Sequence, residues 1–242
     1  MTLRMSNLSR TALVAGILGG LVLSGCGGGT GLGPSEIKQR EERLRDRLPI
    51  DWSDYRTGDY AAAIESFTQT LEQADVVEGV EGVKTLVKAE AQNGIGWAYL
   101  RLQDLPAAAQ AFTLSTRLDR NNPDAWVGWA GVALALRQYA DVLQYANQAL
   151  ELEADYNSGA RLDPGNRILS HDTLDERHVR LMLAEAYFQL GRYSAADRPD
   201  PNNAAAQLRL IKNDYRYKDP GELLETMSQV AIQLQSTITA GN

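Results

Sequence analysis

Apolar and small residues recur at helical spacing through the middle of the chain, and this pattern repeats along the sequence. Residues 89–122 and residues 123–156 each hold two such stretches, joined by a short polar turn. The two segments correspond at a spacing of 34, so that Gly96 falls on Ala130. A repeat of this length predicts pairs of helices that stack side by side, with small residues where two helices approach closely.

Two further segments show part of the same pattern. Residues 58–67 match the second half of a unit, and we expect Pro49 and Asp51 to disrupt the helix before it. Residues 180–193 match the first half of a last unit, whose second helix Pro199 is expected to interrupt. The chain is therefore expected to hold about four units, of which roughly two are clear and two are partial.

Extra residues enter this pattern at two places. The first insertion lies around residues 76–87, between the first and second units. The second covers residues 157–174, which are rich in Gly, Pro and Asn and contain the turn signature DPGN at residues 163–166. We expect the second insertion to be a loop.

The residue types at fixed positions of the units resemble those of the tetratricopeptide repeat. With Pro123 as position 1, Trp126 stands at position 4, Ala130 at position 8 and Tyr139 at position 17. The resemblance implies an all-α fold, a helix-turn-helix solenoid in which the first helix of each unit lines a concave face. It also assigns Trp126 and Trp129 to the core between the helices.

Both ends of the stack are expected to carry an additional helix. Apolar residues follow helical spacing from Pro220 to Ser236, and Asp219 before Pro220 is a favourable helix start. We expect this helix to cap the stack, since the last repeat otherwise leaves an apolar face in water. The alternative is that it lies in the groove and blocks it. Residues 35–48 are crowded with charges and predict a solvated helix ahead of the stack.

The start of the chain has a different pattern. Arg4 and Arg10 precede an apolar run at residues 11–23, which is shorter than the roughly 20 residues of a membrane-spanning helix. The run leads into the sequence LSGC, and Cys26 is the only cysteine of the chain. This order resembles the signal of a bacterial lipoprotein, which implies cleavage before Cys26 and acylation of its thiol.

The two resemblances together imply a domain organisation. Residues 1–25 would form the signal peptide, residues 26–34 the lipidated Cys26 with a Gly-rich tether, and residues 35–242 the solenoid. Gly27 stands where diderm lipoproteins retained at the inner membrane commonly have aspartate. We therefore expect a lipid-anchored protein of the bacterial cell envelope, at the outer membrane and facing the periplasm.

The charge balance narrows the classes of partner. Removal of residues 1–25 takes away two arginines and no acid, which leaves 22 basic against 31 acidic residues, a formal charge of −9. This balance argues against nucleic acid, whose phosphates require clustered Lys and Arg. It also argues against a basic patch for anionic lipid, so the acyl chains would provide the anchor. With one cysteine, no intramolecular disulfide can form.

Transfer of the repeat family's inner-face positions to this sequence gives the candidate partner-binding residues. They are Trp52, Tyr55 and Arg56 in the first unit, Asn93, Trp97, Leu100 and Arg101 in the second, Val127 and Leu134 in the third, and His178, Leu181, Glu185 and Phe188 in the fourth. Trp52 and Trp97 share one position, and Arg56 and Arg101 share another. Aromatic rings beside guanidinium groups suit a peptide with apolar anchors and carboxylates. The alternative is that Trp97 packs against the neighbouring repeat.

Candidate chemistry is confined to the two histidines. Ser170, His171 and Asp172 are the residue types of a catalytic triad, but adjacency in sequence does not supply the geometry. His171, Asp172, Asp175 and His178 could ligate a metal, although Asp172 also suits a helix N-cap with Asp175 in the first turn. No phosphate-binding glycine loop is present. The sequence therefore predicts neither an enzyme, nor a cofactor, nor a metal site.

Three classes of function remain. The favoured one is a lipid-anchored module of the envelope that scaffolds or recruits partner proteins through the concave groove. The second is a pilotin-like assembly or structural factor for an outer-membrane complex. The third is a metal-dependent binder or enzyme that uses residues 171–178. We expect a protein or peptide in the groove, attachment to the membrane through Cys26, and no nucleic acid.

Overall fold

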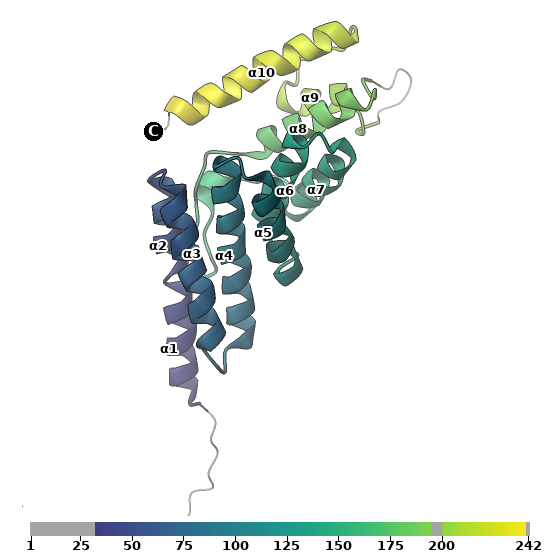
Figure 1. Ribbon diagram of the computed structural model, residues 1–242. Coiled ribbons are helices and arrows are strands. Elements are labelled where there is room, and N and C mark those ends of the chain that lie inside the picture. Colours follow the sequence, from purple (N-terminus) through teal and green to yellow (C-terminus); the bar gives the residue numbers. More distant parts are fainter. Residues whose placement is uncertain (1–31, 195–199, 241–242) are drawn as a thin grey trace, which may run out of the picture. The chain divides into compact units, whose positions relative to one another are not determined.

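Helices account for the regular structure of the described residues, 32–194 and 200–240, in this computed structural model (Figure 1), apart from two isolated β-bridges. The helices are α1 (Pro34–Arg45), α2 (Leu48–Arg56), α3 (Tyr60–Val76), α4 (Glu81–Arg101), α5 (Leu105–Leu118), α6 (Pro123–Ala135), α7 (Tyr139–Leu152), a 3-10 helix (Ser158–Ala160), α8 (Glu176–Gln189), α9 (Ala204–Ile211) and α10 (Pro220–Ala240). The expected all-α fold is confirmed. None of the described helices is long and apolar enough to cross a membrane. The expected signal peptide, Cys26 and residues 27–31 lie outside the described residues.

The two helices of each unit are joined by the same kind of turn. The second residue after the first helix adopts the left-handed backbone conformation, and this conformation reverses the chain within a few residues. The residues in this conformation are Gly58, Gln103, Arg137 and Gly191, with φ angles of 84°, 62°, 58° and 73°. In the second unit, Asp104 then caps α5 by accepting a hydrogen bond from the Ala107 amide at 3.2 Å.

Glycines allow helices to pack closely around buried phenylalanines, both within a unit and between units. A Cβ atom at Gly128 on α6 would lie 2.2 Å from Cζ of Phe112 on α5, and one at Gly96 on α4 would lie 2.7 Å from Cε1 of the same ring. Gly94 meets Phe67 of the preceding unit in the same way, at 2.1 Å. Both rings are fully buried. These contacts are the close helix approaches that the small residues of the repeat predict.

The first unit departs from expectation. α2 forms despite Pro49, because Pro49 lies in its first turn, where a backbone N–H has no partner within the helix. Asp51 is fully buried and accepts hydrogen bonds from the hydroxyls of Ser66 at 2.8 Å and Thr70 at 2.7 Å, both on α3. The prediction that Pro49 and Asp51 disrupt this helix is wrong, since Asp51 instead joins α2 to α3.

The first insertion lengthens helices rather than adding a long loop. α3 has 17 residues and α4 has 21, against 13 for α6, and only residues 77–80 connect α3 to α4.

The tryptophans of the third unit are less enclosed than expected. Trp126 and Trp129 are half-buried, and Trp129 stacks on Tyr145 of α7 with ring centroids 4.0 Å apart.

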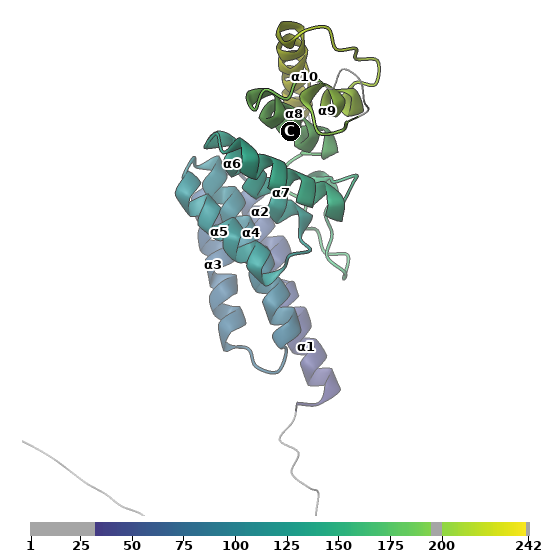
Figure 2. The ribbon, with the colours of Figure 1, turned by 90° about the vertical axis from the view of Figure 1, so that its right-hand side faces the viewer.

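The C-terminal helices gather at one end of the stack (Figures 1 and 2). α9 begins at Ala204, and Pro199, expected to interrupt this helix, lies outside the described residues. α10 packs on both α8 and α9 and buries Leu223 and Met227. Its first turn is capped by Asp219, whose Oδ1 accepts a hydrogen bond from the Glu222 amide at 3.0 Å. The expected capping helix is therefore present.

Candidate functional site

The second insertion folds back onto the inner helices α2, α4 and α6. We call residues 157–174 the finger; it links α7 to α8 in the chain, and in Figure 1 it is the pale green segment seen to the left of α4. Its two ends meet, because the Ser158 amide donates to the Leu174 carbonyl at 2.8 Å. Within it, Leu162 and Ile168 form an antiparallel bridge around the expected turn at residues 163–166. The finger is thus a loop, as predicted, with a short hairpin of its own.

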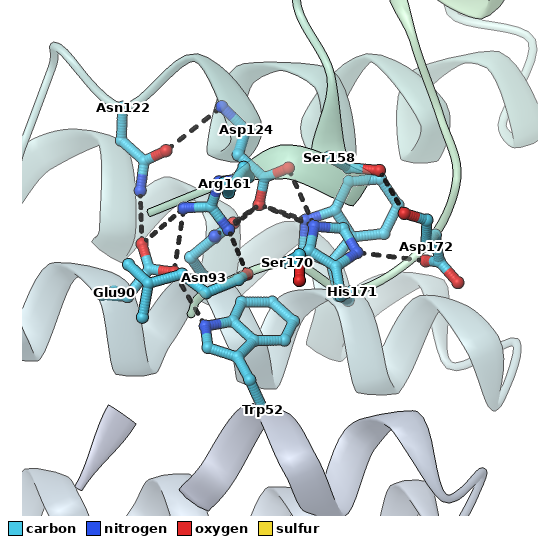
Figure 3. A network of polar contacts seen from close by, with 12 residues as sticks. Trp52, Glu90, Asn93, Asn122, Asp124, Ser158, Arg161, Ser170, His171 and Asp172 are labelled. Carbon is cyan, nitrogen blue, oxygen red and sulfur yellow. Dashed lines mark hydrogen bonds and ion pairs between the residues drawn. The ribbon is translucent and has the colours of Figure 1, made fainter. Parts of the chain in front are cut away.

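Arg161 of the finger lies between two acidic side chains of the inner helices (Figure 3). Its Nη2 donates to both oxygens of Glu90 on α4, at 2.9 Å each. Its Nη1 lies 3.0 Å from Oδ2 of Asp124 on α6. The guanidinium carbon also stands 5.6 Å from the centroid of the Trp52 ring on α2, in cation–π range. One finger side chain therefore contacts three helices.

His171 of the finger occupies an aromatic and acidic cage. Its imidazole is fully buried and stacks on Trp52 with centroids 4.5 Å apart and planes 12° apart. Trp97 of α4 lies 4.9 Å away on another side. Nε2 is 2.9 Å from Oδ1 of Asp124, and Nδ1 is 3.2 Å from Oδ2 of Asp172. Burial alone would lower the pKa of His171, but these two carboxylates raise it above its ordinary value of 6.5.

Asp124 is the centre of this network. It is fully buried and accepts hydrogen bonds from Asn93 Nδ2 at 2.7 Å, from Trp97 Nε1 at 3.0 Å and from the Tyr156 hydroxyl. Burial alone would raise the pKa of Asp124, but Arg161 and His171 outweigh that effect and hold the pKa well below its ordinary value. Asp124 is therefore ionised at neutral pH.

We call the surface that the finger covers the inner wall. It consists of Trp52, Glu90, Asn93, Trp97 and Asp124, from α2, α4 and α6. At its edge the Tyr55 hydroxyl donates to Asp172 Oδ2 at 2.7 Å, and Arg56 Nη1 donates to the Ser170 carbonyl at 2.6 Å. These contacts fix the last part of the finger against α2.

The expectation of an open inner face in the first three units is wrong. Five of the candidate partner-binding side chains are buried, with exposed fractions of 4 % or less. They are Trp52, Tyr55, Asn93, Trp97 and Val127. The physical reason is that four of them contact the finger or its partner Asp124, and Val127 packs in the core of the stack. The alternative for Trp97 is also incomplete, because it packs on Phe112 and on His171 alike.

The remaining candidates keep some exposure. They are Arg56, Leu100, Arg101, Leu134, His178, Leu181, Glu185 and Phe188. Arg56 and Arg101 line one hollow of about 160 Å³, together with Tyr55, Tyr60 and finger residues 171–173; we call it the arginine hollow. Leu181, Glu185 and Phe188 line a second hollow, of about 170 Å³, between α8 and α10. The C-terminal helix therefore partly covers the candidate face of the fourth unit.

The two histidines are not brought together as a metal site. His178 belongs to a capping box at the start of α8, in which its Nδ1 accepts a hydrogen bond from the Asp175 amide at 3.1 Å. Asp175, not Asp172, is the N-cap of that helix, so the expected N-cap was placed three residues too early. Within residues 32–194 and 200–240, no group of three or more His, Cys, Asp or Glu side chains could hold a metal ion.

Sequence reasoning missed Glu90, Asp124 and Arg161. A signal for two of them was present, because Glu90 and Asp124 are both the second residue of a clear unit and stand 34 residues apart. That position lies on the inner side of the first helix. No comparable signal marked Arg161, since its partners are 71 and 37 residues away in the chain.

A comparison with models of protein families supports the repeat assignment. Residues 52–125 match the family model of the tetratricopeptide repeat. One similar solved structure is a chain from Podosopora anserina, assigned as a kinesin light chain with nearly identical TPR-like repeats. It shares 15% sequence identity over 81% of this chain and 98% of that chain, with a TM-score of 0.44. No curated protein matches the sequence. The family match confirms tetratricopeptide repeats in residues 52–125.

Proposed function

We propose that this chain is a lipid-anchored interaction module of the bacterial envelope, which recruits a partner protein through its tetratricopeptide repeats. The helical repeat supports a protein partner, since stacked repeats present extended binding surfaces. The sequence pattern supports the anchor, because the apolar run at residues 11–23 leads to the single cysteine, Cys26. The lipid on Cys26 would hold the repeats close to the outer membrane.

The observation that carries a partner site is the arginine hollow. Arg101 Nε donates to the Tyr60 hydroxyl at 3.0 Å, and Arg56 uses Nη1 for the Ser170 carbonyl. Each guanidinium has five N–H donors, so most of their donor capacity remains available to a ligand. Two guanidinium groups around one hollow suit a carboxylate of the partner, which can accept paired hydrogen bonds from each.

Crosslinking in intact cells, followed by purification and mass spectrometry, tests this site. In the Arg56→Ala/Arg101→Ala variant, the yield of the crosslinked partner should fall about tenfold or more, because charge-assisted contacts are lost. Arg43→Ala/Arg209→Ala is the matched control, since it removes two exposed arginines from α1 and α9. Equal partner yields from both variants would show that the arginine hollow is not the contact site.

Fractionation of cells tests the anchor separately. Cys26→Ser should move the protein from the membrane to the soluble fraction, because the serine hydroxyl is not a substrate for thioether-linked lipid attachment. Intact-mass measurement of the wild-type protein should show a chain that begins at Cys26 and carries acyl groups. A wild-type chain that keeps residues 1–25 and carries no acyl group would contradict the proposed anchor.

A further inference from the structure

We propose that the inner wall is a binding surface for a cationic peptide segment and that the finger occupies it as an internal ligand. The inference rests on the proposed function and adds the regulation of the same repeats. A partner segment of matching chemistry reaches the inner wall only by displacing the finger. The finger therefore sets how much of the wall is available to a partner.

The finger is built as a separate piece. Its neck is closed by the bridge between Asn157 and Asp175 and by the Ser158 hydroxyl, which accepts a hydrogen bond from the Leu174 amide at 2.9 Å. Its hairpin has its own backbone hydrogen bonds, from the Asp163 amide to the Arg167 carbonyl and from the Leu169 amide to the Arg161 carbonyl, each 3.0 Å. None of these contacts involves the inner wall, so the hairpin keeps them if it moves away.

The contacts between the finger and the wall are those of a bound cationic ligand. Arg161 supplies a guanidinium to Glu90 and Asp124, and His171 supplies a flat ring to the space between Trp52 and Trp97. The wall contributes two carboxylates and two indole rings, and the finger contributes a guanidinium and an imidazole. Charge-assisted pairs and aromatic stacking are the usual anchors of peptide recognition.

The wall also keeps one acceptor that the finger does not use. Asn93 is fully buried, and its Nδ2 donates to Asp124, but its Oδ1 accepts no hydrogen bond among the described residues. An unpaired buried acceptor costs free energy. A segment that adds one donor here, besides a guanidinium and a flat ring, matches the wall more fully than the finger does. The partner chemistry is thus an Arg-containing segment with a His or aromatic side chain.

The direct test supplies the finger in trans. The probe is a synthetic peptide of residues 157–174, and the protein is the full chain in detergent with residues 159–173 replaced by a short Gly-Ser linker. The neck residues meet, so the linker spans a gap that the native chain already closes. The peptide should bind the excised protein at least about tenfold more tightly than the intact protein, where the finger competes. A peptide with Arg161→Ala and His171→Ala should not bind.

A second variant covers the case in which excision prevents folding. The Arg161→Ala/His171→Ala chain keeps its finger but loses both cationic contacts, and it should also bind the wild-type peptide. Arg167→Ala is the matched control, because Arg167 pairs with Asp46 and Asp163 away from the wall and should leave the peptide excluded. Helical circular dichroism reports folding of every variant.

Each outcome of the peptide-binding experiments either supports or overturns the proposal. Peptide binding by either variant, together with exclusion from the wild type and from Arg167→Ala, supports an internal ligand. A folded excised protein that does not bind the peptide overturns the proposal. So does an excised protein that unfolds while the double variant excludes the peptide, since the finger is then part of the core. No cellular partner enters this test, so its failure is distinct from a failure of the crosslinking experiment.

Discussion

The contacts within the stack of repeats and the contacts between the finger and the inner wall are of opposite kinds. In the stack, the Phe112 ring lies against Gly96 of its own unit and Gly128 of the next, and the contact is apolar, close and local in sequence. Between the finger and the inner wall, Arg161 and His171 lie against Glu90 and Asp124 and the contact depends on charge. The first kind of contact builds the fold from its repeat, and the second kind closes one face of it.

This comparison has a functional consequence. An apolar contact between helices has no soluble competitor of the same chemistry, whereas an acidic and aromatic wall can accept any cationic segment that offers the same groups. Damage to the stack should therefore lower the stability of the whole domain. Substitutions that remove contacts between the finger and the inner wall should in addition release the finger and expose the wall.

The largest effect is expected from Asp124→Ala. The carboxylate of Asp124 is fully buried and neutralises Arg161 and His171 of the finger. Loss of one member of a buried ion-pair network costs about 3–5 kcal/mol, because Arg161 then keeps only Glu90 and His171 keeps only Asp172 as an acidic partner. Urea unfolding should show this loss, and trypsin should cut the folded variant at Arg161. A finger that stays resistant to trypsin would contradict the role of Asp124 in holding it.

A smaller effect is expected from Gly128→Ala in the stack. The added Cβ would lie 2.2 Å from the Phe112 ring, so α5 and α6 must separate, at a cost of about 1–3 kcal/mol. The finger should stay protected from trypsin in the folded state. Gly82→Ala is the control, because nothing lies within 4 Å of a Cβ at that position of α4. Alanine there should raise stability by up to about 1 kcal/mol, and equal losses at both sites would refute the close packing.

Stability should also depend on pH through His171. Asp124 and Asp172 face its imidazole, with Arg161 and Tyr55 nearby, and its pKa in the folded chain is raised above 6.5. A raised pKa gives a contribution that is full below pH 6.5 and is lost as pH rises through the folded-state pKa. Thermal unfolding measured from about pH 6 to about pH 9 should show the loss, because this interval begins below 6.5 and extends well above it.

His171→Phe serves as the control for this pH dependence. Phenylalanine keeps a ring against Trp52 and Trp97 but cannot titrate. The variant should show a flatter stability profile than the wild type in the same pH range. Identical profiles for the two proteins would mean that folding does not shift the pKa of His171.

The smallest effect is expected from Arg167→Ala. Arg167 pairs with Asp46 at 2.7 Å, but the Asp46 side chain is 64% exposed. Its other partner, the buried Asp163, keeps Arg45 as a second basic neighbour. Exposed pairs contribute about 0–1 kcal/mol, since water and salt screen them. Urea unfolding should place the variant within that range of the wild type, and the finger should stay resistant to trypsin. A loss comparable to that of Asp124→Ala would mean that Arg167 at the tip of the finger, rather than Arg161 and His171, holds it in place.

The same contrast explains what the sequence could predict. The helix pairs, the turn after each first helix and the C-terminal capping helix follow from local periodicity, so α5, α6, α7 and α10 are found where they are expected, whereas α4 begins earlier, at Glu81 within the expected insertion. Pro49 was misread because its effect depends on whether it falls in the first turn of a helix.

The contacts between the finger and the inner wall could be predicted only in part. Glu90 and Asp124 place an acidic residue at the same position of two units, and this repetition could have marked the inner wall. Arg161 lies in an irregular segment and meets Glu90 across 71 residues, and no periodicity encodes that contact. The repeat pattern alone predicts an open groove at the wall residues, but it contains no information on where an inserted segment packs.

The central claim is that the finger is seated on the inner wall, and a double-mutant cycle between Arg161 and Glu90 tests it most directly. Urea unfolding of Arg161→Ala, Glu90→Ala and the double variant gives the coupling free energy of the pair. Two nearly buried groups joined by two hydrogen bonds at 2.9 Å should couple by about 1–3 kcal/mol. A coupling indistinguishable from zero would show that the finger does not rest on the wall in solution.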